Sequence, residues 1–189
     1  MTGRRIRWPR PLRALRRDRR GLALIEFAMI LPILLILLIL YLGSVQLQDG
    51  ISCNRKVTIA TRGVADLIAQ NATGSTTQRE IDNSLAAATQ VMAPYPAARA
   101  MIRLTHVTID NNYQARVDWS RALNGIPDVK GTVATIPTQM RVRGVSFLIA
   151  RVTYAYQPPT NFGFIGPIKL GDSLIMLPRN SSAVTCVDC

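Results

Sequence analysis

The stretch Arg16-Arg17-Asp18-Arg19-Arg20-Gly21-Leu22-Ala23-Leu24-Ile25-Glu26-Phe27 decides the fold, because it joins a cationic arm to an apolar run that ends at Leu42. Residues 22–42 contain one charged side chain, Glu26. Their number matches the roughly 20 apolar residues that a helix needs to cross a bilayer. Pro32 lies inside the run, where membrane helices tolerate it. The stretch therefore predicts a transmembrane helix over residues 22–43.

Positive charge is concentrated before this helix. The chain of 189 residues has a formal net charge of +12, and residues 1–20 hold nine arginines against one aspartate. Arginines that flank a membrane helix favour the cytoplasmic side, so we expect a cytoplasmic N-terminus and a chain that otherwise lies outside. A basic chain can also indicate nucleic-acid binding. No basic stripe interleaved with aromatic residues follows the arm, so we expect no nucleic-acid partner.

A removable secretory signal is the competing interpretation of the same segment. Its apolar core would span about 7–15 residues and end in a small-x-small cleavage site. Here the run is longer, and Gly43-Ser44-Val45-Gln46-Leu47 follows it. A twin-arginine signal fits poorly too, because the apolar core is very hydrophobic. We therefore expect the hydrophobic helix to be retained.

The pattern Gly-x-x-x-x-Glu-Phe, formed by Gly21, Glu26 and Phe27, lies between a basic arm and an apolar helix. It resembles the processing site of bacterial type IV pilin-like precursors and is most similar to that of the TadE-like pseudopilins of the tight-adherence (Tad/Flp) pilus. Residues 55–70 add to the resemblance, and residues 152–158 add to it weakly. The resemblance implies that a prepilin peptidase cuts between Gly21 and Leu22 and discards residues 1–21 as a cytoplasmic leader.

The same resemblance implies a location and partners. The chain would be a single-pass protein of the bacterial inner membrane with a periplasmic C-terminal domain, and after processing it could enter the pilus. Its partners would be the prepilin peptidase, other pilin or pseudopilin subunits and the tight-adherence assembly machinery. Glu26 and Phe27 would form the assembly contact.

Elementary chemistry agrees with this assignment. Glycine before the scissile bond lets an extended backbone approach a protease closely. The new ammonium group of Leu22 would lie in or near the apolar phase, where an unpaired charge is costly. Glu26, one helical turn on, offers the opposite charge to its own or a neighbouring subunit's ammonium. The simpler interpretation, which stays open, is that Glu26 only reaches toward the membrane interface.

Beyond the anchor, the apolar periodicity predicts an α+β protein with a helical stalk over residues 44–70 and a head over residues 71–189. The stalk carries an apolar stripe of helical period: Cys53, Val57, Ala60, Val64, Leu67 and Ile68. Gly50 and Gly63 weigh against an unbroken helix. Thr77 and Glu80 have the spacing of a capping box, and Ile81, Leu85, Ala88 and Met92 continue a second helix up to Pro94.

The rest of the head predicts a small antiparallel sheet. Strand-like segments span residues 101–109, 113–119, 145–156, 168–177 and 183–187, with a long loop over 121–138. Within the second of them, the alternation of Tyr113, Ala115, Val117 and Trp119 with polar residues predicts one buried face.

Catalysis has little support in the sequence. His106 is the only histidine, so a histidine pair or a Ser-His-Asp set is impossible, and it is expected to be a packed or surface residue. The phosphate-binding glycine motifs do not occur. We therefore expect no enzyme activity, no cofactor and no metal. The favoured function is a minor pilin-like subunit or assembly factor. The alternative is an unprocessed, membrane-anchored periplasmic binding or scaffold protein.

Three cysteines are the remaining chemical feature. Cys53, Cys186 and Cys189 are all expected on the outer, oxidising side, where disulfides persist. We prefer a bridge between Cys53 and Cys186, which would tie the C-terminal strand to the stalk. A bridge between Cys186 and Cys189 is the alternative.

Overall fold

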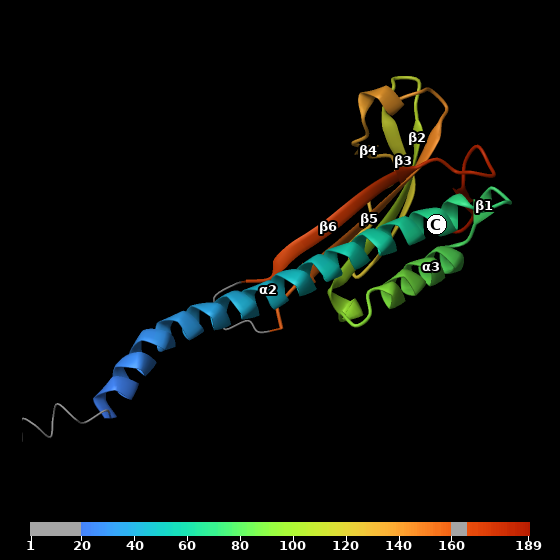
Figure 1. Cartoon of the computed structure of the whole chain (residues 1–189). Coiled ribbons are helices and arrows are strands. Elements are labelled where there is room, and N and C mark those ends of the chain that lie inside the picture. Colours follow the sequence, from blue (N-terminus) through green and yellow to red (C-terminus); the bar gives the residue numbers. More distant parts are fainter. Residues whose placement is uncertain (1–19, 160–165) are drawn as a thin grey trace, which may run out of the picture. The chain divides into compact units, whose positions relative to one another are not determined.

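The computed structural model describes residues 20–159 and 166–189 (Figure 1). It divides into two units, Met1–Val45 and Gln46–Cys189. Residues 1–19 of the expected leader lie outside the described residues. The described parts form an α+β protein with a long N-terminal helix and an antiparallel sheet.

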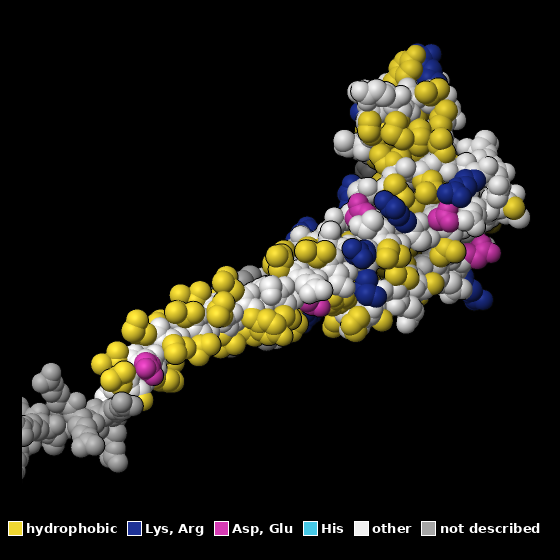
Figure 2. All heavy atoms as spheres, viewed as in Figure 1, with side chains coloured by type: hydrophobic (Ala, Val, Ile, Leu, Met, Phe, Trp, Pro, Cys, Tyr) yellow, Lys and Arg dark blue, Asp and Glu magenta, His cyan; other side chains and the backbone are white. Residues whose placement is uncertain are grey.

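Helix α2 (Arg20–Ala69) is 50 residues long and includes Pro32. The large apolar side chains from Leu22 to Tyr41 are each more than half exposed. Figure 2 shows these side chains covering the part of the chain that adjoins the grey residues. Among the described residues, α2 is the one helix long and apolar enough to cross a membrane, so it is a candidate membrane anchor.

Gly50 and Gly63 do not interrupt α2, so the expectation that they weigh against an unbroken helix is wrong. A glycine costs a helix about 1 kcal/mol relative to alanine, which tertiary packing can offset. At Gly50 the Tyr156 ring lies 3.5 Å from the position that a Cβ would take. The ring therefore packs directly against the helix here, at a distance where a Cβ would make an ordinary van der Waals contact.

The predicted stripe along the second part of α2 is confirmed except at one position. Cys53, Val57, Ala60, Val64 and Ile68 are buried, whereas Leu67 is 53% exposed. Each residue turns a helix by about 100°, and toward its C-terminal end the buried face of α2 rotates toward Ala65 and Ala69, which are buried instead. Leu67 consequently falls on the outer side of the helix.

Helix α3 (Gln78–Val91) begins with the predicted capping box. The Thr77 hydroxyl oxygen accepts a hydrogen bond from the Glu80 backbone N–H at 3.3 Å, and the Glu80 carboxylate accepts one from the Thr77 N–H at 3.0 Å. The predicted apolar face of this helix is confirmed, because Ile81, Leu85, Ala88 and Met92 are all buried.

Five strands form an antiparallel sheet in the order β4-β3-β2-β5-β6. Their bounds are β2 (Ala100–Ile109), β3 (Ala115–Leu123), β4 (Val133–Ala134), β5 (Ser146–Tyr156) and β6 (Ile168–Met176). Two short strands, β1 (Ser75–Thr76) and β7 (Thr185–Cys186), form a separate parallel pair. Single 3₁₀ turns span Ala97–Arg99 and Thr138–Met140.

Two details of the predicted sheet are wrong. Tyr113 belongs to the turn before β3, where its φ of 61° and its 48% exposure remove it from the buried alternation. Ala115, Val117 and Trp119 are buried as predicted. The expected loop over residues 121–138 contains the end of β3 and the short strand β4, because β4 pairs with Ala115 and Arg116.

Apolar residues gather on both faces of the sheet. In β5, Leu148, Ala150 and Val152 join the larger core under α2 and α3, whereas Phe147 and Ile149 join a smaller cluster. Successive side chains of a strand point to opposite faces, so the two clusters lie on opposite sides of the sheet. Figure 1 shows α3 and the later part of α2 along one side of the sheet.

Burial predicts different costs for two helical leucines. Leu85→Ala should lower the free energy of unfolding by about 2–5 kcal/mol, because it opens a cavity in the larger core. Leu67→Ala should change it by less than about 0.5 kcal/mol, because Leu67 is on the surface. Denaturant unfolding of the full chain in detergent, followed by tryptophan fluorescence, measures both. Equal losses in the two variants would contradict the observed rotation of the buried face.

Candidate functional site

The Gly21–Phe27 junction forms the first turns of α2. Gly21 is the second residue of the helix, and Leu22 and Phe27 are 60% and 61% exposed. A Cβ built on Gly21 would meet nothing within 4 Å among the described residues. Packing therefore does not require a glycine here.

Glu26 lies one turn beyond Leu22 on the same side of the helix, because residues four apart are neighbours on a helical surface. Its side chain is exposed and makes no hydrogen bond or ion pair within the described residues. Glu26 is thus available to a positive group from outside the described residues.

A second polar grouping, which sequence reasoning missed, surrounds Asp49. Its carboxylate accepts hydrogen bonds from the hydroxyls of Tyr95 (2.8 Å) and Tyr156 (2.7 Å). The Tyr95 ring meets the Tyr154 and Tyr156 rings edge to face at 6.2 and 6.4 Å. These partners lie 46 and 107 residues away from Asp49 in sequence, so no local pattern indicates them.

The Asp49 grouping fixes α2 to the rest of its unit. Burial first, and the Asp49 carboxylate second, raise the pKa of Tyr156, because a phenolate would be poorly solvated and would face a negative charge. The resulting stability is present below the ordinary tyrosine pKa and is lost as the pH rises above it. Both carboxylate oxygens are engaged by the two tyrosines, so this grouping positions elements and offers no free catalytic acid.

The cysteines do not pair as preferred. The structure has a Cys186–Cys189 disulfide, with a Cα–Cα distance of 5.6 Å, and Cys53 is a buried free thiol. The Cys53–Cys186 expectation is wrong because β7 lies near the C-terminal end of α2, where Arg179 N–H donates to the Ala69 carbonyl. At a rise of 1.5 Å per residue, Cys53 lies about 24 Å from Ala69 along the axis of α2. A disulfide tolerates only about 7 Å between Cα atoms.

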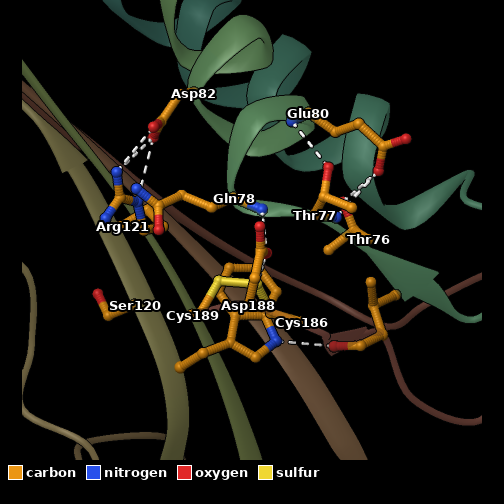
Figure 3. The surroundings of a disulfide bond; sticks show 12 residues. Thr76, Thr77, Gln78, Glu80, Asp82, Ser120, Arg121, Cys186, Asp188 and Cys189 are labelled. Carbon is orange, nitrogen blue, oxygen red and sulfur yellow. Dashed lines mark hydrogen bonds and ion pairs between the residues drawn. A yellow bond between two sulfur atoms is a disulfide. The ribbon is translucent and has the colours of Figure 1, made fainter.

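The disulfide shapes a C-terminal loop that reaches the start of α3 (Figure 3). The Asp188 carboxylate accepts a hydrogen bond from the Gln78 backbone N–H at 2.6 Å, which satisfies one of the unpaired donors at the helix N-terminus. Val187 N–H donates to the Thr76 carbonyl at 3.0 Å. Nearby, Arg121 of β3 forms an ion pair with Asp82 of α3 at 2.7 Å. The loop therefore fastens the chain end to α3 and β1.

The ligand atoms of Cys186, Asp188 and Cys189 lie within 4.8 Å of one another, which is close enough for a metal. The two sulfur atoms are bonded to each other, however, and metals bind the thiolate form of cysteine. While the disulfide is intact, this trio cannot act as a thiolate site.

His106 is a packed residue, as expected, and its partner Asp118 reaches it through a β-bulge. The register of β2 and β3 shifts between His106 and Val107, so Asp118 is the extra residue of β3. The Asp118 carboxylate lies 2.8 Å from His106 Nδ1 and accepts from the Thr108 hydroxyl at 2.6 Å. Burial would raise the pKa of Asp118, but the hydrogen bonds from His106 and Thr108 and the nearby charge of Lys130 together hold it below its ordinary value.

The His106–Asp118 pair resembles part of a catalytic triad but lacks its chemistry. His106 Nε2 accepts the Val184 N–H at 3.3 Å, and the ring stacks on Trp119 at 5.7 Å. With Nδ1 bonded to Asp118, both ring nitrogens have partners within the protein. A general base needs a nitrogen within reach of the substrate proton. The pair borders a surface hollow of about 290 Å³, but it orders the C-terminal segment and offers no nitrogen to a ligand.

The Gly21–Glu26 junction thus offers a charge that has no partner among the described residues and that lies in an apolar setting.

In comparisons with protein-family models, with curated proteins and with solved structures, nothing matches the chain.

The thiols should differ in reactivity. Burial, assisted by Asp49, raises the pKa of the Cys53 thiol to about 11, and the thiolate is the reactive form. Iodoacetamide should therefore leave Cys53 unmodified in the folded chain and label it after unfolding. Cys186 and Cys189 should be labelled in the folded chain only after reduction. Peptide mapping by mass spectrometry measures the labelling of Cys53 and that of the other two cysteines. A peptide that links Cys53 to Cys186, or fast labelling of folded Cys53, would contradict the structure.

Proposed function

We propose that this protein is a minor pilin-like subunit, or an assembly factor, of a tight-adherence-type pilus in the bacterial inner membrane. A prepilin peptidase cuts the chain between Gly21 and Leu22, and the C-terminal unit lies in the periplasm. One observation carries the proposal. Glu26 is the one charged side chain in the apolar segment of residues 22–42, and it follows Gly21 by five residues.

Energetics favour a role for Glu26. A carboxylate at the centre of a membrane helix costs about 2.5–3.5 kcal/mol on insertion scales, and less near the end. Glu26 has no partner among the described residues that would offset such a cost. Cleavage after Gly21 creates an ammonium group one turn away. A carboxylate and an ammonium that pair within or between subunits remove each other's penalty, which favours insertion of the subunit beside its neighbours.

The second unit is consistent with a structural subunit. The later part of α2 packs through Cys53, Val57, Ala60 and Val64 into the core of an antiparallel sheet, which is the stalk-and-head arrangement expected of a pilin-like protein. The Cys186–Cys189 disulfide supports the periplasmic location, because disulfides persist in oxidising compartments. The alternative function, an unprocessed anchored binding or scaffold protein, differs in that it keeps residues 1–21.

Gly21→Ala tests the processing step. Neither the space around Gly21 nor its helical backbone opposes a methyl group, so the variant should fold normally. A side chain before the scissile bond should slow cleavage by about 100-fold, because small displacements at a reacting centre cost that much. Mass spectrometry of the membrane-bound chain measures the ratio of precursor to mature protein.

The matched control for this experiment is Gly43→Ala. It lies in the same helix, and a Cβ there also meets nothing within 4 Å. It should be cleaved as the wild type is. A mature N-terminus at Leu22, formed in normal amounts in the Gly21 variant, would remove the processing claim.

Glu26→Ala tests the assembly contact separately. The chain should still be cut after Gly21, but the amount of assembled pilus should fall by about tenfold, the effect of losing roughly 1.4 kcal/mol per contact. Met29→Ala is the control, because Met29 is 68% exposed on the same helix and carries no charge. Quantitative immunoblots of sheared pili and membranes measure the two steps. Normal piliation by the Glu26 variant would mean that Glu26 only reaches the membrane interface.

A further inference from the structure

Two arginines face each other on the side of the sheet that α2 and α3 leave open. Arg103 of β2 and Arg151 of β5 are direct partners in the antiparallel register. Arg151 projects to the same face as Ile149, two residues earlier in β5, and therefore away from the larger core. Side chains in such positions lie about 5 Å apart at Cβ, and like charges there repel each other.

Only part of this positive charge is neutralised by the protein. Arg103 forms an ion pair with Asp128 at 2.5 Å, and Asp128 also accepts the Thr105 hydroxyl at 2.8 Å. Arg151 and Lys169 are exposed and have no carboxylate partner among the described residues. The sequence of residues 160–165 contains no acidic residue that could supply one. Asp128 thus offsets the charge of Arg103, and the charges of Arg151 and Lys169 are left for a ligand to neutralise.

A hollow of about 240 Å³ lies beside the arginine pair. Three cations, Arg103, Arg151 and Lys169, line it together with Thr153, Gly125 and Ile126, and no acidic residue does. Lys169 comes from β6, where it pairs with Ala155, four residues beyond Arg151 in β5, so three adjacent strands contribute one cation each. The sheet fixes the backbone positions of the three cations, whose side chains line the hollow.

We propose that this hollow, named here the sheet-face cation site, binds a phosphate monoester group. Guanidinium groups form paired hydrogen bonds with phosphate oxygens, and lysine adds a point charge. A phosphate monoester carries close to two negative charges and three acceptor oxygens near neutral pH. It therefore suits a hollow lined by three cations, two of them without a carboxylate partner among the described residues, better than a carboxylate, which carries one charge. The group can belong to a soluble phosphate compound or to a lipid headgroup.

Isothermal titration calorimetry on the full chain in a nonionic detergent tests this site. The two probes are inorganic phosphate and a short-chain phosphatidic acid, both at about pH 7.5, where the second phosphate proton is largely lost. Saturable one-to-one binding of either probe is expected. Tighter binding of inorganic phosphate assigns the site to a soluble anion, and tighter binding of the lipid assigns it to a headgroup.

Two variants separate a built site from general charge attraction. Arg151→Gln should weaken binding at least about tenfold, because one charged hydrogen-bonding group is lost. It should not lower the denaturation midpoint, since it also removes the repulsion with Arg103. Arg62→Gln removes an exposed cation from α2, outside the hollow, and should leave binding unchanged. Absence of binding by both probes, or equal weakening in the two variants, would overturn the proposal.

Discussion

The constraint on which the rest of the structure depends is the exposed apolar surface of α2 between Leu22 and Tyr41. Each large apolar side chain left in water forgoes about 1.5–3 kcal/mol. A continuous helical surface of this kind needs a bilayer or other apolar helices around it. Glu26 is notable for the same reason. An unpaired carboxylate costs little on a surface that faces water, but it costs free energy in an apolar environment. The proposed cut after Gly21 supplies the charge that Glu26 lacks.

The C-terminal unit differs, since many of its apolar residues form a buried core and several of its acids are paired within the unit. Asp49 takes two tyrosine hydroxyls, Asp82 pairs with Arg121, and Asp188 caps α3. These contacts join the start of the unit, its middle and its last residues into one core. Several of its cations are paired as well, but Arg151 and Lys169 have no carboxylate partner among the described residues. A unit with a fixed core and unpaired charge on one face is suited to contact something outside itself.

Sequence reasoning succeeded where the signal is local. The capping box of α3 and the buried stripe of α2 depend on spacings of three and four residues, and both were predictable. It failed where distant segments meet. The bulge that carries Asp118 to His106 and the tyrosines around Asp49 depend on tertiary contacts, and so does the separation of Cys53 from Cys186 that excludes the preferred disulfide. The Gly21–Glu26 pair is also a local signal, a spacing along one helix, and its role in processing and assembly stays a prediction.

The central claim is that the processed chain begins at Leu22. The most direct measurement is N-terminal sequencing of the wild-type chain, purified from the membranes of bacterial cells with and without a prepilin peptidase. The account predicts a sequence that starts Leu-Ala-Leu-Ile-Glu when the peptidase is present and a chain that retains the arginine-rich arm when it is absent. The same intact N-terminus in both preparations would contradict it.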